Sequence, residues 1–374
     1  MSSPNVFALS IHADYACRHS GACCSADWDV PVELPVYRSL DEAITSGRVR
    51  PQAAARHLSP FVFEPDLPEG AAAMLERTDA GECVFLEHET KLCIVHRDMG
   101  EAALPATCRH FPRLAVRDER GTFITLSHFC PTAASMLFRD DCALAIVAGP
   151  RAFPPLDYEG LTVTTNDLPP LLSPTMLMDL AGYSAWEYHM VARCAETGMS
   201  PESVVETLTR DARLLRNWRP GGITLVDAVR TLPDRPERTD APGTVEASVT
   251  LFEQVMRAVP DDLRPPPDES GLDSAFAHFV SPAWSTFHAP LNRYLAAKAF
   301  ASWTAYQGRG IMTIVRGLDA ALSVVRLESA RQCRNARRAL DARLLRDAFR
   351  RADFILNHLA VAEELAEAWS LAES

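Results

Sequence analysis

The sequence predicts a mainly α-helical protein in which a small, irregular α+β cysteine-rich N-terminal domain packs on a C-terminal helical domain. Three observations support this fold class. Eight of the ten cysteines precede residue 143. A Pro-rich stretch follows, and apolar residues recur at three- and four-residue spacing only after about residue 175. The 374 residues also exceed the roughly 100–200 residues of one domain. We therefore expect a cysteine-cluster domain over 1–150, a connection over 151–175 and a helical domain over 176–374.

Turns and short extended runs, such as 28–32 and 121–126, characterise the first domain. Its clearest predicted element is a β-hairpin, in which 82–87 (ECVFLE) and 92–96 (LCIVH) flank a turn over 88–91. If Cys83 and Cys93 bind one centre, their side chains must share a face of the hairpin. That condition requires paired residue numbers with an even sum, as when Leu86 pairs with Leu92. We predict this even register, unless one of the two cysteines lies beyond the paired region.

The connection contains FPPLDYEG and NDLPPLLSP, which suit a linking segment because proline is unfavourable inside helices. The periodicity then predicts helices over 176–196, 201–218, 244–259, 282–306, 313–334 and about 338–371. Ser200 precedes Pro201, so the second of these helices is expected to begin with a serine N-cap and proline at the first helical position.

The composition excludes several classes of protein. Hydrophobic residues make up 47% and charged residues 23%, which is typical of a globular protein and not of a disordered, collagenous or coiled-coil chain. A net charge of −12 argues against nucleic acid as a partner. The sequence begins without a signal-peptide pattern and contains no apolar run of 18 residues. We therefore expect a soluble, cytoplasmic protein with no membrane partner, whose clustered cysteines bind metal more readily than they form disulfides.

The cysteines of the first domain form a candidate metal site. Gly21 lies between Cys17 and the adjacent pair Cys23 and Cys24, so the backbone can fold back and bring sulfurs together. The candidate ligands are Cys17, Cys23, Cys24, Cys83, Cys93, Cys108 and Cys130. Because a zinc centre takes only four ligands, at about 2.3 Å for sulfur, seven cysteines imply spare thiols, two metals or a cluster. Disulfides and a catalytic thiol are the alternatives. Cys142, Cys194 and Cys333 are expected to be small buried hydrophobes.

Charged and imidazole side chains accompany these sulfurs. Arg18, Arg97 and Arg109 lie near cysteines in the sequence and could compensate the charge of a thiolate centre. His19, His96, His110 and His128 could each supply a nitrogen ligand, although a histidine taken alone is more often a surface or hydrogen-bonding residue.

The spacing and flanking residues resemble those of the YkgJ-type cysteine-cluster family, a CxxCxxCC family of zinc- or iron-chelating domains. The family pattern continues with a cysteine before Phe-Leu, a Cys-Ile segment ending in arginine, and Cys-Arg-x-Phe-Pro. The matching segments are 83–86 (CVFL), 93–97 (CIVHR) and 108–112 (CRHFP), and the likeness extends over roughly residues 12–135. Ser20 stands where the family has its second cysteine, and serine is a poor ligand for soft metals. Cys130 is the expected replacement.

The longer members of this family include the flagellin lysine-N-methylases. This chain is similar to them in 28–30 (WDV), 112–113 (PR), 130–134 (CPTAA) and 292–295 (NRYL). The resemblance implies a [4Fe–4S] centre and methyl transfer from S-adenosylmethionine to lysines of a protein substrate. No G-x-G-x-x-G follows a strand and no CxxxCxxC triad occurs, so the catalytic and cofactor-binding residues stay unassigned. From the residues alone, 292–294 would be a partly buried helix face.

Arginines also recur near the C-terminus, at 331, 334, 337, 338, 343, 346, 350 and 351. Such a run could bind an acidic partner or a nucleic acid, although it more often forms a solvated helix face. The sequence therefore supports three hypotheses. The first is a metal- or iron–sulfur-binding protein, the second an S-adenosylmethionine-dependent protein-lysine methyltransferase that uses the same centre, and the third a metal-stabilised interaction module.

Overall fold

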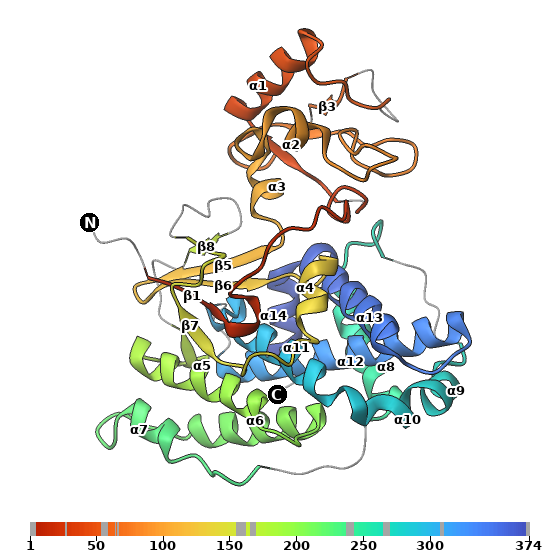
Figure 1. Ribbon diagram of the computed structural model, residues 1–374. Helices are drawn as coiled ribbons and strands as arrows, with labels where there is room; N and C mark the ends of the chain where they lie inside the picture. The colour runs from red at the N-terminus through yellow and green to blue at the C-terminus, as the bar shows by residue number, and fades with distance from the viewer. Residues whose placement is uncertain are drawn as a thin grey trace.

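A computed structural model describes residues 5–26, 28–53, 59–63, 65, 67–154, 162–164, 170–236, 243–264, 270–306 and 310–371. Figure 1 shows three layers, namely a small irregular unit at the top, a sheet below it and a set of helices at the bottom. We call residues 17–110 the cap and the remaining described residues the body. The predicted fold class is confirmed, because a sheet-containing N-terminal region precedes a helical C-terminal region.

The cap has a hydrophobic core of its own. A three-stranded antiparallel sheet, in the order β2 (Pro31–Glu33), β4 (Ala71–Leu75) and β3 (Phe61–Val62), lies beside helix α1 (Leu34–Thr45). Val32, Leu40 and Phe85 are buried in this core, and Cys24, Cys83, Cys93 and Cys108 belong to it or pack against it. Three short helices complete the cap: α2 (Ile94–Met99), the 3₁₀ turn η2 (Glu101–Ala103) and α3 (Ala106–His110).

The body begins with a five-stranded mixed sheet. Its order is β7 (Ile146–Ala148), β1 (Val6–Leu9), β6 (Gly121–Leu126), β5 (Arg113–Asp118) and β8 (Thr162–Thr164). Strands β5 and β6 form a tight antiparallel hairpin, and β1 runs parallel to β6. The 3₁₀ turn η1 (Ser10–His12) follows β1, and helix α4 (Pro131–Met136) follows β6. This sheet connects the two ends of the cap to the helical layer, because the cap enters after η1 and leaves through β5.

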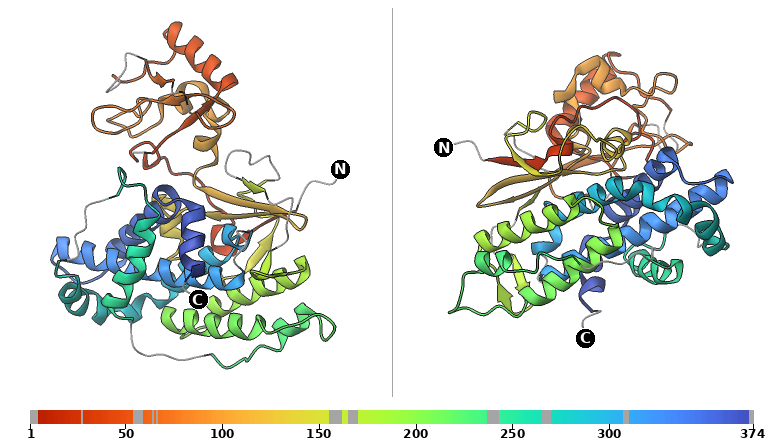
Figure 2. Two further views of the ribbon diagram at one scale, coloured as in Figure 1. Left: turned by 180° about the vertical axis from the view of Figure 1, so that it is seen from behind. Right: turned by 60° about the horizontal axis from the view of Figure 1, so that its bottom comes forward.

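Helices cover one face of the sheet, as both views in Figure 2 show. The helical layer consists of α5 (Leu180–Ala195), α6 (Pro201–Leu215), α7 (Leu225–Arg230), α8 (Val245–Arg257), α9 (Leu272–Ala275), α10 (Ser281–Trp284), α11 (His288–Ala299), α12 (Ile311–Ala336), α13 (Ala342–Phe354) and α14 (Ala362–Leu371). Shorter pieces are β9 (Leu171–Ser173), β10 (Met176–Leu177), η3 (Phe276–Val280), η4 (Ser285–Phe287), η5 (Trp303–Tyr306) and η6 (Ile355–Leu359). Leu9 and Phe123 of the sheet share a single large core with these helices.

The N-cap prediction is confirmed, because the Ser200 side chain accepts a hydrogen bond from the Ser203 N–H and Pro201 begins α6. Two helices that were predicted to be continuous are interrupted. The helix expected over 282–306 leaves helical geometry at Phe300, where buried Glu187 accepts the Ala301 N–H at 3.1 Å. The helix expected over 338–371 is interrupted at Ala360, which is extended.

The predicted β-hairpin at the cysteines is also wrong. One antiparallel bridge, Leu86 with Cys93, stands in place of the expected ladder, and α2 begins at Ile94 where a strand was predicted. The sum of those residue numbers is odd, so the predicted even register is not the one observed. The reason is a turn in which the Leu86 N–H bonds to the Cys83 carbonyl, because a turn removes the strand alternation on which the register prediction depended.

Much of the predicted Pro-rich connection, 155–161 and 165–169, lies outside the described residues. Among the helices that the structure describes, none combines the length and the apolarity needed to cross a bilayer.

Candidate metal centre

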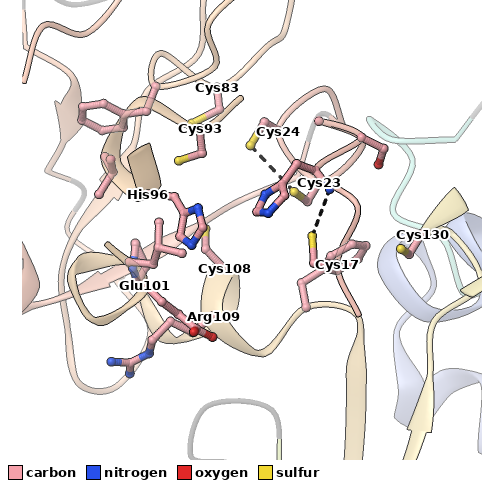
Figure 3. A pocket seen from close by; sticks show the side chains of 18 of the residues that line it. Cys17, Cys23, Cys24, Cys83, Cys93, His96, Glu101, Cys108, Arg109 and Cys130 are labelled. Atoms are coloured by element: carbon pink, nitrogen blue, oxygen red, sulfur yellow. Dashed lines mark hydrogen bonds between the residues drawn. The ribbon is translucent and has the colours of Figure 1, made fainter. Parts of the chain in front are cut away.

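All seven predicted cysteine ligands line one pocket in the cap, which has a volume of about 160 Å³. Figure 3 shows Cys17, Cys23, Cys24, Cys83, Cys93 and Cys108 around one space, while Cys130 lies to one side. The cysteines come from separate loops and short helices that the cap core holds together. Cys142, Cys194 and Cys333 are not among the described residues that line this pocket.

Local backbone geometry brings the first loop to the pocket. Gly21 has φ +69°, and the N–H groups of Cys24 and Ser25 both bond to its carbonyl at 3.0 Å. A Cβ built on Gly21 would stand 2.9 Å from the Lys91 carbonyl oxygen. The Cys83 N–H then donates to the Cys24 carbonyl at 2.7 Å, which fixes the second cysteine segment against the first. The structure thus confirms that the loop folds back at glycine.

Short helices position two further thiols. Cys93 is the N-cap of α2, and Cys108 lies within α3. A sulfur at a helix N-terminus is stabilised as thiolate by the free N–H groups of the first turn. Backbone N–H groups of Val95 and His96 act on Cys93 in this way, and together with a hydrogen bond from the Cys24 thiol they lower the pKa of Cys93 to about 7.

The five inner thiols form a mutually interacting set, which we call the inner thiols: Cys23, Cys24, Cys83, Cys93 and Cys108. The sulfurs of Cys23 and Cys24 are 3.8 Å apart. Hydrogen bonds with Cys23 and Cys93 raise the pKa of Cys24, and the bond from Cys24 lowers the pKa of Cys23 below its ordinary value. Burial raises the pKa of Cys83 to about 11 and that of Cys108 well above the usual range. The negative charges of neighbouring thiolates repel one another. Several inner thiols can therefore ionise together only if a cation lies among them.

Two thiols lie at the outer edge of the pocket. Cys130 has the Tyr15 hydroxyl 3.7 Å from its sulfur, and Cys17 accepts the His19 N–H at 3.4 Å. Burial, followed by the charge of Cys130, raises the pKa of Tyr15. Cys130 is the N-cap of α4 in the body, whereas the other six cysteines of the pocket belong to the cap.

The predicted charge compensation is partly wrong. Arg18 and Arg109 line the pocket, but Arg97 is directed to Glu87 and Asp98 and is not part of the described lining. The sequence analysis missed Arg77, which forms an antiparallel bridge with Cys83 and whose charge acts on Cys83 and Cys108. Arg77 could not be recognised from the sequence, because it is six residues from the nearest cysteine and a bend of the chain brings it to the thiols.

The histidines divide into two groups. His19 and His96 line the pocket and stack on each other with ring centroids 5.1 Å apart. His128 is fully buried in the body, where its Nδ1 lies 3.1 Å from Asp353 Oδ2 and its Nε2 lies 3.4 Å from His12 Nε2. Asn292 and Tyr294 are likewise buried on α11, bonded to Met199 O and Asp353. These residues stabilise the body and do not contribute to the thiol pocket.

The pocket is larger than the space that a single ion occupies. Within the part of the chain that the structure describes, no three or more Cys, His, Asp or Glu side chains are arranged to hold one metal ion as they stand. The 160 Å³ cavity exceeds by roughly tenfold the 10–15 Å³ that one water-sized sphere requires. The donors are soft thiols, which favour zinc, copper(I) and iron–sulfur clusters. A single ion would require the sulfurs to close inward.

Residues 16–131 match the model of the CxxCxxCC family, described as a putative zinc- or iron-chelating domain. This segment contains all seven pocket cysteines. No curated protein and no solved structure matches the chain significantly.

Proposed function

From the premise that residues 16–131 are a domain of the CxxCxxCC zinc- or iron-chelating family, we propose that this is a cytoplasmic iron–sulfur protein whose inner thiols hold a [4Fe–4S] cluster. The observation that carries the proposal is the number of inner thiols together with the size of the pocket that they line. Five sulfurs face a cavity larger than one ion, and a cluster of this type takes four thiolates. Cys17 and Cys130 then lie at its outer edge.

Cationic and N–H groups near the inner thiols support this assignment. A thiolate-ligated cluster carries negative charge, which guanidinium groups and backbone N–H donors stabilise. Arg18 and Arg109 belong to the pocket lining, and the charge of Arg77 favours the thiolate forms of Cys83 and Cys108. The cluster, when bound, would supply electron transfer or Lewis-acid chemistry, and this chain's residues would orient it and limit its contact with water.

Two other assignments predict different results. A metal-stabilised interaction module would hold zinc and would be colourless. A protein-lysine methyltransferase would bind S-adenosylmethionine and would take a protein as substrate. Binding of S-adenosylmethionine measured by calorimetry on the metal-loaded chain separates the methyltransferase from a cluster protein without that activity.

Single cysteine variants test which thiols hold the metal. Cys23→Ser and Cys108→Ser should lose metal and destabilise the cap, because serine is a poor ligand for soft metals. Cys194→Ser is the matched control, since Cys194 is buried in the body core and should leave the metal content unchanged. Metal and sulfide analysis after anaerobic purification measures each effect. Equal loss from all three variants would contradict the assignment.

A further inference from the structure

A second and larger cavity lies between the cap and the body. This cleft has a volume of about 1230 Å³, and its walls come from the cap loops around Trp28 and Arg77 and from body residues that include Ser127 and Asn357. It shares Leu75, Phe111 and Arg113 with the thiol pocket, so the two cavities are neighbours. No thiol of the proposed metal centre is among the described residues that line the cleft, and Arg77 is the cleft residue whose charge also acts on Cys83 and Cys108.

Unpartnered donors are buried in the cleft wall. Among the described residues, Arg77 Nη1, Thr78 Oγ1 and Asn357 Nδ2 are buried without a hydrogen-bond partner, and all three residues line the cleft. The other terminal nitrogen of Arg77 donates to the Trp28 carbonyl, which holds the guanidinium in place. A buried donor left unpaired is costly, so it marks a place where an acceptor is expected. Each of these three atoms can donate a hydrogen bond, and Arg77 Nη1 and Asn357 Nδ2 cannot accept one.

An aromatic wall accompanies these donors. The ring centroid of Trp28 lies 4.6 Å from that of His358 and 5.0 Å from that of Phe111. All three residues line the cleft, and the Ser127 hydroxyl fixes the imidazole of His358 at 2.8 Å. Such a wall favours a flat apolar group.

The mouth of the cleft limits the charge of its ligand. Asp29, Asp79 and Asp262 line the cleft and are exposed. These three carboxylates, and the buried Glu76 that also lines the cleft and accepts the Arg77 backbone N–H at 2.9 Å, disfavour a polyanion by like-charge repulsion, whereas a small ligand with one or two negative charges can reach the guanidinium of Arg77. The rim therefore excludes a nucleic acid strand and admits a small ligand.

We propose that the cleft is a binding site for a small organic anion with a planar ring, whose carboxylate or phosphate oxygens accept hydrogen bonds from Arg77, Thr78 and Asn357 while the ring packs on Trp28. The site does not depend on the proposed metal centre. Asn357 belongs to the body and is not among the described residues that line the thiol pocket, so it can be changed without disturbing a thiol ligand.

The test uses 8-anilinonaphthalene-1-sulfonate, a planar aromatic monoanion, titrated into the full chain with fluorescence as the readout. We expect one probe molecule to bind per chain. The affinity for the probe should be about tenfold or more weaker in Asn357→Leu, because a charge-assisted hydrogen bond is lost. Thr78→Val provides a second variant from the opposite wall. The neutral N-phenyl-1-naphthylamine should bind both variants as it binds the wild type. Asp79→Asn is the matched control and should leave the affinity equal or tighter.

Competition identifies the head group, because displacement by benzoate indicates a carboxylate ligand and displacement by phenyl phosphate indicates a phosphate ligand. Failure of the sulfonate probe to bind, or equal affinity in the wild type, Asn357→Leu and Thr78→Val, overturns the proposal. Displacement by neither competitor overturns it as well. Metal analysis of the same samples keeps the two proposals separate, since an anion site without metal would refute only the iron–sulfur assignment.

Discussion

The buried carboxylate of Asp353 allows the most quantitative prediction. Asp353 lies on α13 with no solvent exposure and accepts hydrogen bonds from the Tyr294 hydroxyl at 2.7 Å, the His128 N–H at 2.5 Å and His128 Nδ1 at 3.1 Å. Lys298 forms an ion pair with the same carboxylate. Burial alone would raise the pKa of Asp353, but the charge of Lys298 and the bonds from His128 hold that pKa well below its ordinary value.

Replacing this residue, Asp353→Ala, should lower the free energy of unfolding by about 3–5 kcal/mol, because removing one member of a buried ion pair leaves the other without its partner. The Lys298 side chain is only 14% exposed, so water cannot fully replace the lost carboxylate as a partner of its ammonium. The Tyr294 hydroxyl would lose its acceptor as well, and an unpaired buried polar group costs about 1–3 kcal/mol. These costs overlap and do not add.

Urea denaturation at pH 7.5, followed by circular dichroism, measures the change. Asp347→Ala is the matched control on the same helix, since Asp347 is 38% exposed and its pair with Arg350 has a length of 3.5 Å. A surface pair contributes about 0–1 kcal/mol, so this control should unfold close to the wild type. A loss below about 1 kcal/mol for Asp353→Ala, or one equal to that of the control, would refute the reasoning.

Three further predictions concern the pocket and the buried histidines. Gly21→Ala should reduce metal content and cap stability, because φ +69° and the Lys91 carbonyl leave no room for a Cβ; metal analysis that matches the wild type would contradict this. Cys130→Ser should keep the metal-to-protein ratio of the wild type, and a large drop would make Cys130 a ligand. Burial lowers the pKa of His12 and of His128 in the folded protein. As the pH falls, these two histidines therefore take up protons in the unfolded chain before they do in the folded protein. Stability should therefore be full above about pH 6.5 and should fall as the pH drops below it, and a urea midpoint equal at pH 7.5 and 5 would be the opposing result.

The sequence was sufficient to predict which cysteines meet. Their spacing and the glycine at 21 are local properties, and the structure places all seven around one pocket. Helix positions followed from periodicity, because apolar spacing reports the face that a helix buries. The break at Ala301 was not predictable in the same way, since the group that accepts its N–H belongs to Glu187, more than a hundred residues away.

Long-range polar contacts limited the prediction in the same manner at the site. Arg77 reaches the inner thiols through a bridge with Cys83, and neither its distance in sequence nor its residue type indicated that role. The network of His12, His128 and Asp353 joins three segments that no local pattern connects. The expected hairpin register, which would have placed Cys83 and Cys93 on one face, was wrong because a turn replaced the strand on which side-chain alternation depends.

One measurement tests the central claim most directly, namely iron, sulfide and zinc analysis of the anaerobically purified wild-type chain together with its visible spectrum. We expect about four iron and four sulfide per chain and a broad absorbance near 400 nm that is lost on oxidation. A colourless protein with one zinc per chain, or a chain without stoichiometric metal, would contradict it.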